Sequence, residues 1–146
     1  MSLKISARGQ IDPFIVMDVM RAASALDVAG EGIVHLEVGQ PSTAAPALVR
    51  EAAVAALQTD KLGYTDAFGI APLRERIAAH YQDFYGVNVD PAGVIVTTGS
   101  SGGFLLSFLA AFDVGDRVAL AAPGYPAYSN ILSALGVEPV IIETGL

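Results

Sequence analysis

The chain has 146 residues, 53% of them hydrophobic and 16% charged, which predicts one globular domain and excludes a disordered tail. Eight basic against fifteen acidic residues give a net charge of −7. This acidic balance argues against a protein that binds the phosphate backbone of nucleic acids and against one that binds membranes through a basic patch. The absence of cysteine excludes disulfides, zinc–thiolate sites and cysteine nucleophiles. Without a secretory signal or cysteine, we expect a cytoplasmic protein.

Two uncharged stretches, residues 91–112 and 118–137, are each long enough to span a bilayer. A Thr/Ser/Gly run at residues 97–103 interrupts the first, and Pro-Gly-Tyr-Pro at residues 123–126 interrupts the second. Neither stretch would hold one continuous helix in lipid. The short strands, turns and helices of a buried α/β core explain both better, so no membrane partner is expected.

In chain order, the first predicted element is a helix. Asp12 is placed as its N-cap and Pro13 as its first helical residue, apolar residues follow at helical spacing, and Gly30 closes it. Residues 33–38 then alternate apolar and polar side chains, which predicts a short half-buried strand.

Two further helices are predicted over about residues 46–57 and 70–85. Pro46 opens the first, and Gly86 ends the second. Helical spacing predicts that the second helix turns four side chains inward: Leu73, Ile77, Tyr81 and Phe84.

After Pro91, strands alternate with helices. Residues 94–96, Val-Ile-Val, are typical of a strand buried on both faces. The series continues with a turn over residues 99–103, an apolar helix over 104–112, a strand over 117–121, a helix ending at Gly136 and a strand over 137–142. This alternation predicts an α/β fold with a mostly parallel sheet and helices on both faces. We place the domain boundary near residues 42–46.

The Gly/Ser turn after Val96 is the most informative segment for function. A buried strand, a turn at residues 99–103 and a helix start present backbone N–H groups at the positive end of a helix dipole. Ser100 and Ser101 add hydroxyl donors, and the glycines permit close approach of an anion. The turn therefore predicts a phosphate site, although an ordinary capped turn explains the same residues equally well.

The same residues also fit the G-x-S-x-G nucleophile elbow, which would make Ser101 the nucleophile of a serine hydrolase. That fold needs its histidine after the serine, whereas His35 and His80 both precede it. Neither histidine has a partner at metal-ligand spacing, so no metal site is predicted. A third possibility is a non-catalytic phosphate-binding module.

A rigid loop at residues 122–128 follows the strand predicted at 117–121, and ligands of open α/β sheets bind outside such strand ends. Within it, Tyr125 lies between Gly124 and Pro126 and can present a flat face to a planar cofactor, or simply pack on its own loop. Tyr64, in the Gly-containing loop 61–69, is a weaker signal.

Taken in order, these segments resemble the class I/II pyridoxal-phosphate-dependent aminotransferases of fold type I. The matching pieces are Val38-Gly39-Gln40-Pro41, Tyr64-Thr65 with Gly69, Leu73 and Arg74, residues 97–103, and residues 123–128. The resemblance implies a three-layer α/β/α fold with a mostly parallel sheet. Residues 1–44 would be the N-terminal arm and small-domain segment, and residues 45–146 the first part of the large cofactor-binding domain.

Carried over by residue, the resemblance implies that Gly99, Ser100 and Ser101 bind the 5′-phosphate of pyridoxal 5′-phosphate and that Tyr125 stacks on its ring. Tyr64 would reach the phosphate of the neighbouring subunit in a homodimer with shared active sites. The Gly39 backbone would lie against the substrate α-carboxylate. The activity implied is transfer of an amino group between an amino acid and a 2-oxo acid. Residues 40–42, Gln-Pro-Ser, depart from the family pattern and leave side-chain preference open.

The family's Schiff-base lysine is not matched by Lys4 or Lys61, and we expect it after Leu146. The acidic partner of the pyridine nitrogen and the arginines that bind phosphate and carboxylate are expected there too. We therefore expect these residues to be the front part of a longer enzyme, with the fold incomplete in this chain and the isolated piece unable to transaminate.

Overall fold

The computed structural model describes residues 3–145, which divide into two compact units. The first unit contains the chain up to Val38 and from Thr98 onward, and the second spans Gly39–Thr97. Among residues 3–145, no helix is long and apolar enough to cross a membrane.

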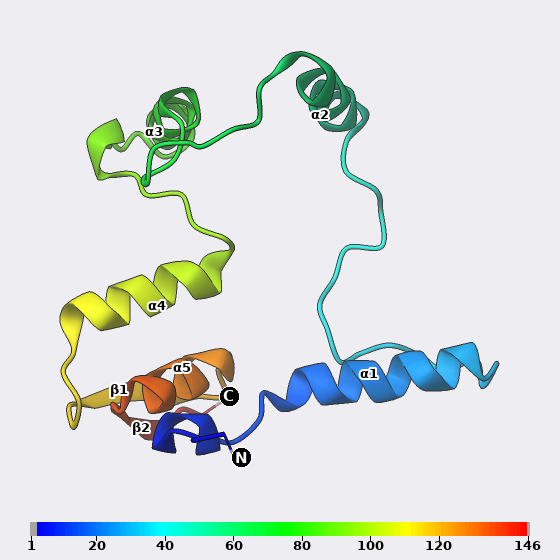
Figure 1. Cartoon of the computed structure of the whole chain (residues 1–146), viewed down its shortest axis with the longest axis vertical. Helices are drawn as coiled ribbons and strands as arrows, with labels where there is room; N and C mark the ends of the chain where they lie inside the picture. The colour runs from blue at the N-terminus through cyan, green and yellow to red at the C-terminus, as the bar shows by residue number, and fades with distance from the viewer. Residues whose placement is uncertain (1–2, 146) are drawn as a thin grey trace. The chain divides into compact units, whose positions relative to one another are not determined.

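The first unit is built on a parallel β-α-β unit (Figure 1). Strands β1 (Arg117–Ala122) and β2 (Glu138–Glu143) pair in parallel, with Arg117 opposite Glu138, and helix α5 (Ala127–Leu135) connects them. Leu132 of α5 is completely buried, and Val137 at the entry to β2 is almost so. The strands, the connecting helix and its end at the left-handed Gly136 confirm the prediction for this part of the chain.

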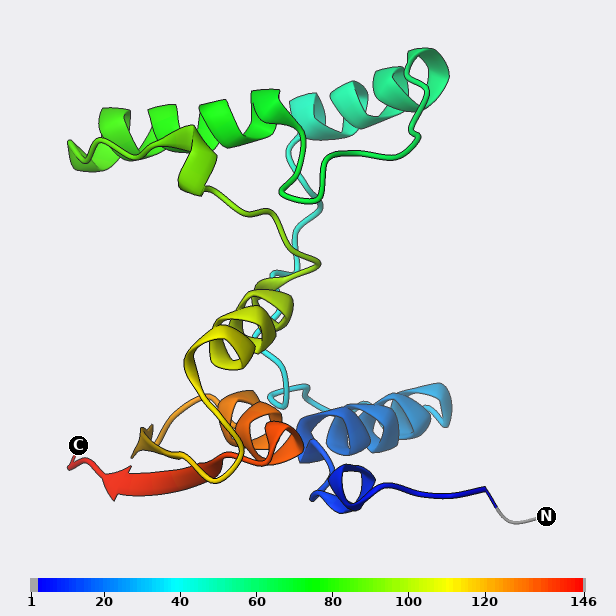
Figure 2. The ribbon, with the colours of Figure 1, turned by 60° about the vertical axis from the view of Figure 1, so that its left-hand side comes forward.

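The other helices of this unit begin at different residues from those predicted. Helix α1 spans Ile15–Val28 with Phe14 at its N-cap, so the prediction that Asp12 caps it is wrong. The Asp12 carbonyl instead accepts a hydrogen bond from Asn130 Nδ2 of α5 at 2.8 Å. This tertiary hydrogen bond takes the place of the helix-capping role that was predicted for Asp12. The short 3₁₀ helix η1 (Ala7–Gln10) precedes α1 and packs against α5 (Figure 2).

Helix α4 spans Ser100–Ala111 and therefore includes residues predicted to form a turn. Its N-cap is Gly99, with φ 82° and ψ 167°, a backbone conformation that glycine adopts without steric cost. The first turn of α4 is thus Ser-Ser-Gly-Gly, and the serines lie at its open end.

The second unit contains helices α2 (Ala47–Thr59) and α3 (Ala71–Tyr85), close to the predicted helices, and the 3₁₀ helix η2 (Pro91–Gly93). Gly86 ends α3 in the left-handed conformation, as predicted. Arg74 Nε donates to the carbonyls of Pro91 at 3.1 Å and Val94 at 3.0 Å, which fastens the segment after α3 to the helix. The expected inward face of α3 is not observed: Ala78 is its buried residue, and Phe84 is 73% exposed.

Two predicted strands are not formed. Residues 33–38 and 94–96 have no strand pairing, and the sheet of the described residues consists of β1 and β2. In the second segment, Val94 N donates to the Pro91 carbonyl at 3.2 Å and Val96 N donates to the Phe68 carbonyl at 3.0 Å. A β-strand needs a ladder of backbone hydrogen bonds to a neighbouring strand. The β-branched composition of residues 94–96 was therefore not enough to make this segment a strand.

Candidate functional site

The N-terminus of α4 has the chemistry of a phosphate cradle. Ser100 and Ser101 are exposed in its first turn, which contains no acidic residue. Helix N-termini otherwise favour a carboxylate in this position, because the dipole and the amide groups attract negative charge. Two hydroxyls and two glycines in that place suit an anion that comes from outside the chain.

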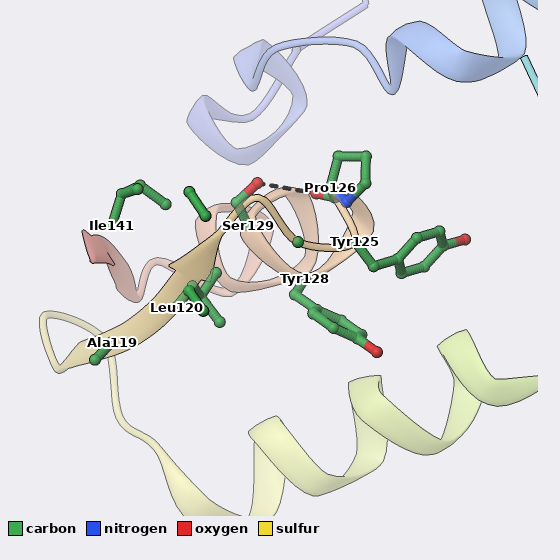
Figure 3. A pocket seen from close by; sticks show the side chains of 10 residues that line it. Ala119, Leu120, Tyr125, Pro126, Tyr128, Ser129 and Ile141 are labelled. Atoms are coloured by element: carbon green, nitrogen blue, oxygen red, sulfur yellow. Dashed lines mark hydrogen bonds between the residues drawn. The ribbon is translucent and has the colours of Figure 1, made fainter. Parts of the chain in front are cut away.

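The Tyr125 loop lies at the carboxyl end of β1, where ligands of parallel sheets bind. A Cβ on Gly124 would lie 2.5 Å from the Ala121 carbonyl oxygen, so this turn requires glycine. Ser129 Oγ donates to the Pro126 carbonyl at 2.9 Å and closes the first turn of α5 (Figure 3). A pocket of about 330 Å³ opens beside the loop, lined by both strands and the start of α5.

A series of aromatic rings joins these two places. Tyr125 and Tyr128 are perpendicular at 5.3 Å between centroids, and Tyr128 packs on Phe104 of α4 at 4.4 Å. Figure 3 shows Tyr128 pointing toward α4 with Tyr125 beside it. Phe104 lies four residues after Ser100, one turn into α4. The serine turn and Tyr125 therefore belong to one packed unit.

These residues fit a ligand with a dianionic tail and a flat heterocycle. Tyr125 is 51% exposed, and the rings that contact it, Phe14 and Tyr128, are both nearly perpendicular to it. No described ring is stacked parallel on Tyr125, and about half of the residue is exposed to a ligand. The hydroxyls and helix dipole of α4 supply the anion-binding end.

The structure brings Gly99, Ser100, Ser101 and Tyr125 together in the first unit. Gly39 and Tyr64 belong to the second unit, where both are exposed. The roles of all six residues stay predictions.

Sequence reasoning missed the contribution of the neighbouring rings. Phe104 falls in the apolar helix predicted over residues 104–112 and Tyr128 in the loop at residues 122–128, and no contact with Tyr125 is predicted for either. The i, i+3 spacing of Tyr125 and Tyr128 at a helix start is a local signal that could have indicated their contact. The contact of Phe14 with Tyr125 has no such signal, because the two positions are 111 apart in the sequence.

The serine hydrolase alternative has no support. His35 directs Nδ1 to Glu37 Oε1 at 2.7 Å and Nε2 to Asp27 Oδ2 at 2.8 Å. Because ionised carboxylates only accept, both contacts are hydrogen bonds at the same time when the ring is protonated. The hydrogen bonds to Glu37 and then Asp27 raise the pKa of His35 and occupy both ring nitrogens, so neither nitrogen is directed at Ser101. His80 is on α3, stacked on Phe84.

The described residues contain no group of three or more His, Cys, Asp or Glu side chains able to hold a metal ion. The functional chemistry visible in this part of the chain consists of hydroxyls, helix amides and aromatic rings.

Comparison with known proteins identifies the family. The model of the family "Aminotransferase class I and II" matches residues 31–145. The chain is 54% identical over 99% of its length to a valine–pyruvate aminotransferase of Mycobacterium tuberculosis, and 36% identical over 90% to a (5-formylfuran-3-yl)methyl phosphate transaminase of Methanocaldococcus jannaschii. It spans only 37% and 36% of these relatives' lengths.

Solved structures agree. An aminotransferase from Mycobacterium tuberculosis has a TM-score of 0.92 at 54% identity, over 99% of this chain and 37% of that one. Aspartate aminotransferase from Thermus thermophilus with maleate has a TM-score of 0.87 at 32% identity, over 98% and 38%. The expected fold, part of the pyridoxal-phosphate-dependent transferase fold type I, is confirmed, and here it forms a small parallel sheet with its helices. The chain belongs to the class I and II aminotransferase family.

Proposed function

We propose that the full-length protein carrying this chain is a pyridoxal-phosphate-dependent aminotransferase that moves an amino group between an amino acid and a 2-oxo acid. The observation that carries the proposal is the family match over residues 31–145. The packed unit that joins the α4 N-terminus to Tyr125 supports it, because it offers both ends of a cofactor site. The other possibility, a phosphate-binding module without catalysis, has no relative among those compared above.

In this proposal the chain binds and orients the cofactor. The Ser100 and Ser101 hydroxyls and the α4 dipole hold the phosphate, and Tyr125 lies against the ring and sets its plane. When bound, the cofactor supplies an electron sink for the charge that develops at the substrate α-carbon. The Gly39 backbone contacts the substrate carboxylate.

The relatives also suggest which substrates to test first. The 54% identical relative is named for valine and pyruvate, whereas several relatives at 30–36% identity are named for aspartate. We propose valine and pyruvate as the first pair, with aspartate as the comparison. Formation of alanine from pyruvate, measured with each donor, decides between them.

The test of the function uses the full-length polypeptide. Added pyridoxal phosphate should give a visible absorbance band that borohydride abolishes, and Ser101→Ala and Tyr125→Ala should each weaken cofactor binding. Ser107→Ala is the matched control, because Ser107 is on the same helix but its hydroxyl donates to the Gly103 carbonyl at 2.9 Å. Absence of the band in the unaltered protein would overturn the proposal.

We further propose a cytoplasmic homodimer in which Tyr64 serves the partner's site. Mixed dimers of a Tyr64→Ala subunit with a Tyr125→Ala subunit test whether each active site contains residues from both subunits. If sites are shared, one of the two sites in each mixed dimer regains both tyrosines, and activity rises on mixing. No gain on mixing contradicts the shared site, and cell fractionation tests the compartment.

A further inference from the structure

The segment just before α1 is held against the start of α5, far away in sequence. Asn130 Nδ2 donates to the Asp12 carbonyl at 2.8 Å, and two residues later the Phe14 ring meets the Tyr125 ring at 6.1 Å with an interplanar angle of 77°. The preceding helix η1 also packs on α5. We call residues 12–14 the N-terminal clamp.

The N-terminal clamp gives Tyr125 a second ring contact. Tyr128 meets Tyr125 at 5.3 Å and 76° from the first turn of α5, and Phe14 meets it from the segment before α1. The backbone at Tyr125 is already restrained, because Gly124 is packed against the Ala121 carbonyl and Pro126 has a fixed φ. The remaining freedom is rotation of the side chain, and two perpendicular neighbours restrict that rotation.

The clamp leaves Tyr125 half exposed, so it restrains the ring without covering it. This arrangement suits a ring that must be presented to a ligand in one orientation before the ligand arrives. A preorganised ring loses less conformational freedom on binding, which strengthens binding without a new contact.

We propose that Phe14 and Asn130 are positioning residues: Asn130 anchors the N-terminal clamp, and Phe14 holds the Tyr125 ring in the orientation that stacks on the cofactor. The inference rests on the proposed function for the identity of the ligand. Neither residue touches the reacting atoms in this account, so loss of either acts through Tyr125.

The first measurement needs no cofactor. Full-length protein with fluorotyrosine is examined by ¹⁹F NMR, and the Tyr125 resonance is assigned by its loss in Tyr125→Phe. Phe14→Leu and Asn130→Ala should both shift or broaden this resonance, and Phe14→Tyr should leave it near the original position in the spectrum. Phe84→Leu and Asn88→Ala are the matched controls, since both positions are exposed and belong to the second unit.

The second measurement uses the cofactor-loaded protein. Phe14→Leu and Asn130→Ala should each raise the pyridoxal phosphate dissociation constant about 2- to 12-fold, the size of one aromatic pair, and reduce the cofactor's induced circular dichroism. The double variant should be no worse than the poorer single variant, because both changes release the same ring. Phe14→Tyr should restore the signal.

An unmoved Tyr125 resonance in Phe14→Leu and Asn130→Ala overturns the inference, as does a moved resonance with unchanged cofactor affinity and dichroism. Unaltered protein that takes up no pyridoxal phosphate overturns the proposed function, and with it the cofactor role of the clamp. The NMR result still decides whether Phe14 and Asn130 hold Tyr125.

Discussion

Replacing Gly69 with alanine should destabilise the loop that carries Tyr64. Gly69 has φ +98°, and a Cβ there would lie 2.7 Å from Val96 Cγ2 and 2.8 Å from Val96 Cβ. The Phe68 carbonyl accepts from the Val96 amide at 3.0 Å, so the loop and residue 96 cannot separate without breaking that bond. The substitution therefore combines backbone strain with a steric clash.

The two costs add. A side chain in the left-handed region costs about 1–2 kcal/mol, and overpacking costs about 1–3 kcal/mol, which gives about 2–5 kcal/mol for Gly69→Ala. The assay is the thermal midpoint of the full-length protein, which falls by about 2–4 °C for each kcal/mol in a domain of 150–250 residues. Gly63→Ala is the control, because its Cβ would meet nothing within 4 Å and its φ is not positive.

A double-mutant cycle separates the two costs. Val96→Gly removes both clashing atoms, Cγ2 and Cβ, but not the strain at Gly69, so the double variant should recover about 1–3 kcal/mol relative to the sum of the single changes. Additive single changes would refute the clash. A Gly69→Ala protein that melts at the original temperature would refute the whole account.

Three other changes test separate features of the first unit. The pKa of His35 is raised above 6.5, mainly by its hydrogen bond with Glu37, so the stabilisation is fully present below pH 6.5 and is lost as the pH rises through the raised value. Thermal midpoints measured across neutral pH should show this loss, and His35→Gln should remove it, whereas His80→Gln should not. Leu132→Ala, at the one completely buried side chain of the described core, should cost about 2–5 kcal/mol in denaturant unfolding. Gly124→Ala places a Cβ 2.5 Å from the Ala121 carbonyl oxygen, so cofactor titration should show weaker binding; unchanged affinity would contradict the close approach.

Local sequence signals were sufficient where an element depends on its own residues. Strands β1 and β2, helix α5 between them, and the ends of α3 and α5 at left-handed glycines were predictable, because their apolar patterns and terminating glycines are local. The helix start at the Gly/Ser segment was recognisable too, whereas its role as an anion site stays a prediction. That α4 begins at Ser100 rather than Phe104 was not recognisable, because glycines in a first turn look like a loop.

The sequence by itself indicated the family, the β-α-β series after residue 117, the helices of the second unit and the candidate residues of the cofactor site. Only the tertiary structure decided which distant segments meet. Asn130 donates a hydrogen bond to the Asp12 carbonyl, the Phe14 ring contacts the Tyr125 ring, and residues 94–96 have no partner strand among the described residues. The physical reason is that hydrogen-bond ladders and ring contacts between distant segments depend on which surfaces meet in space. A residue's own pattern specifies its preference for helix or strand but not the neighbour that satisfies it.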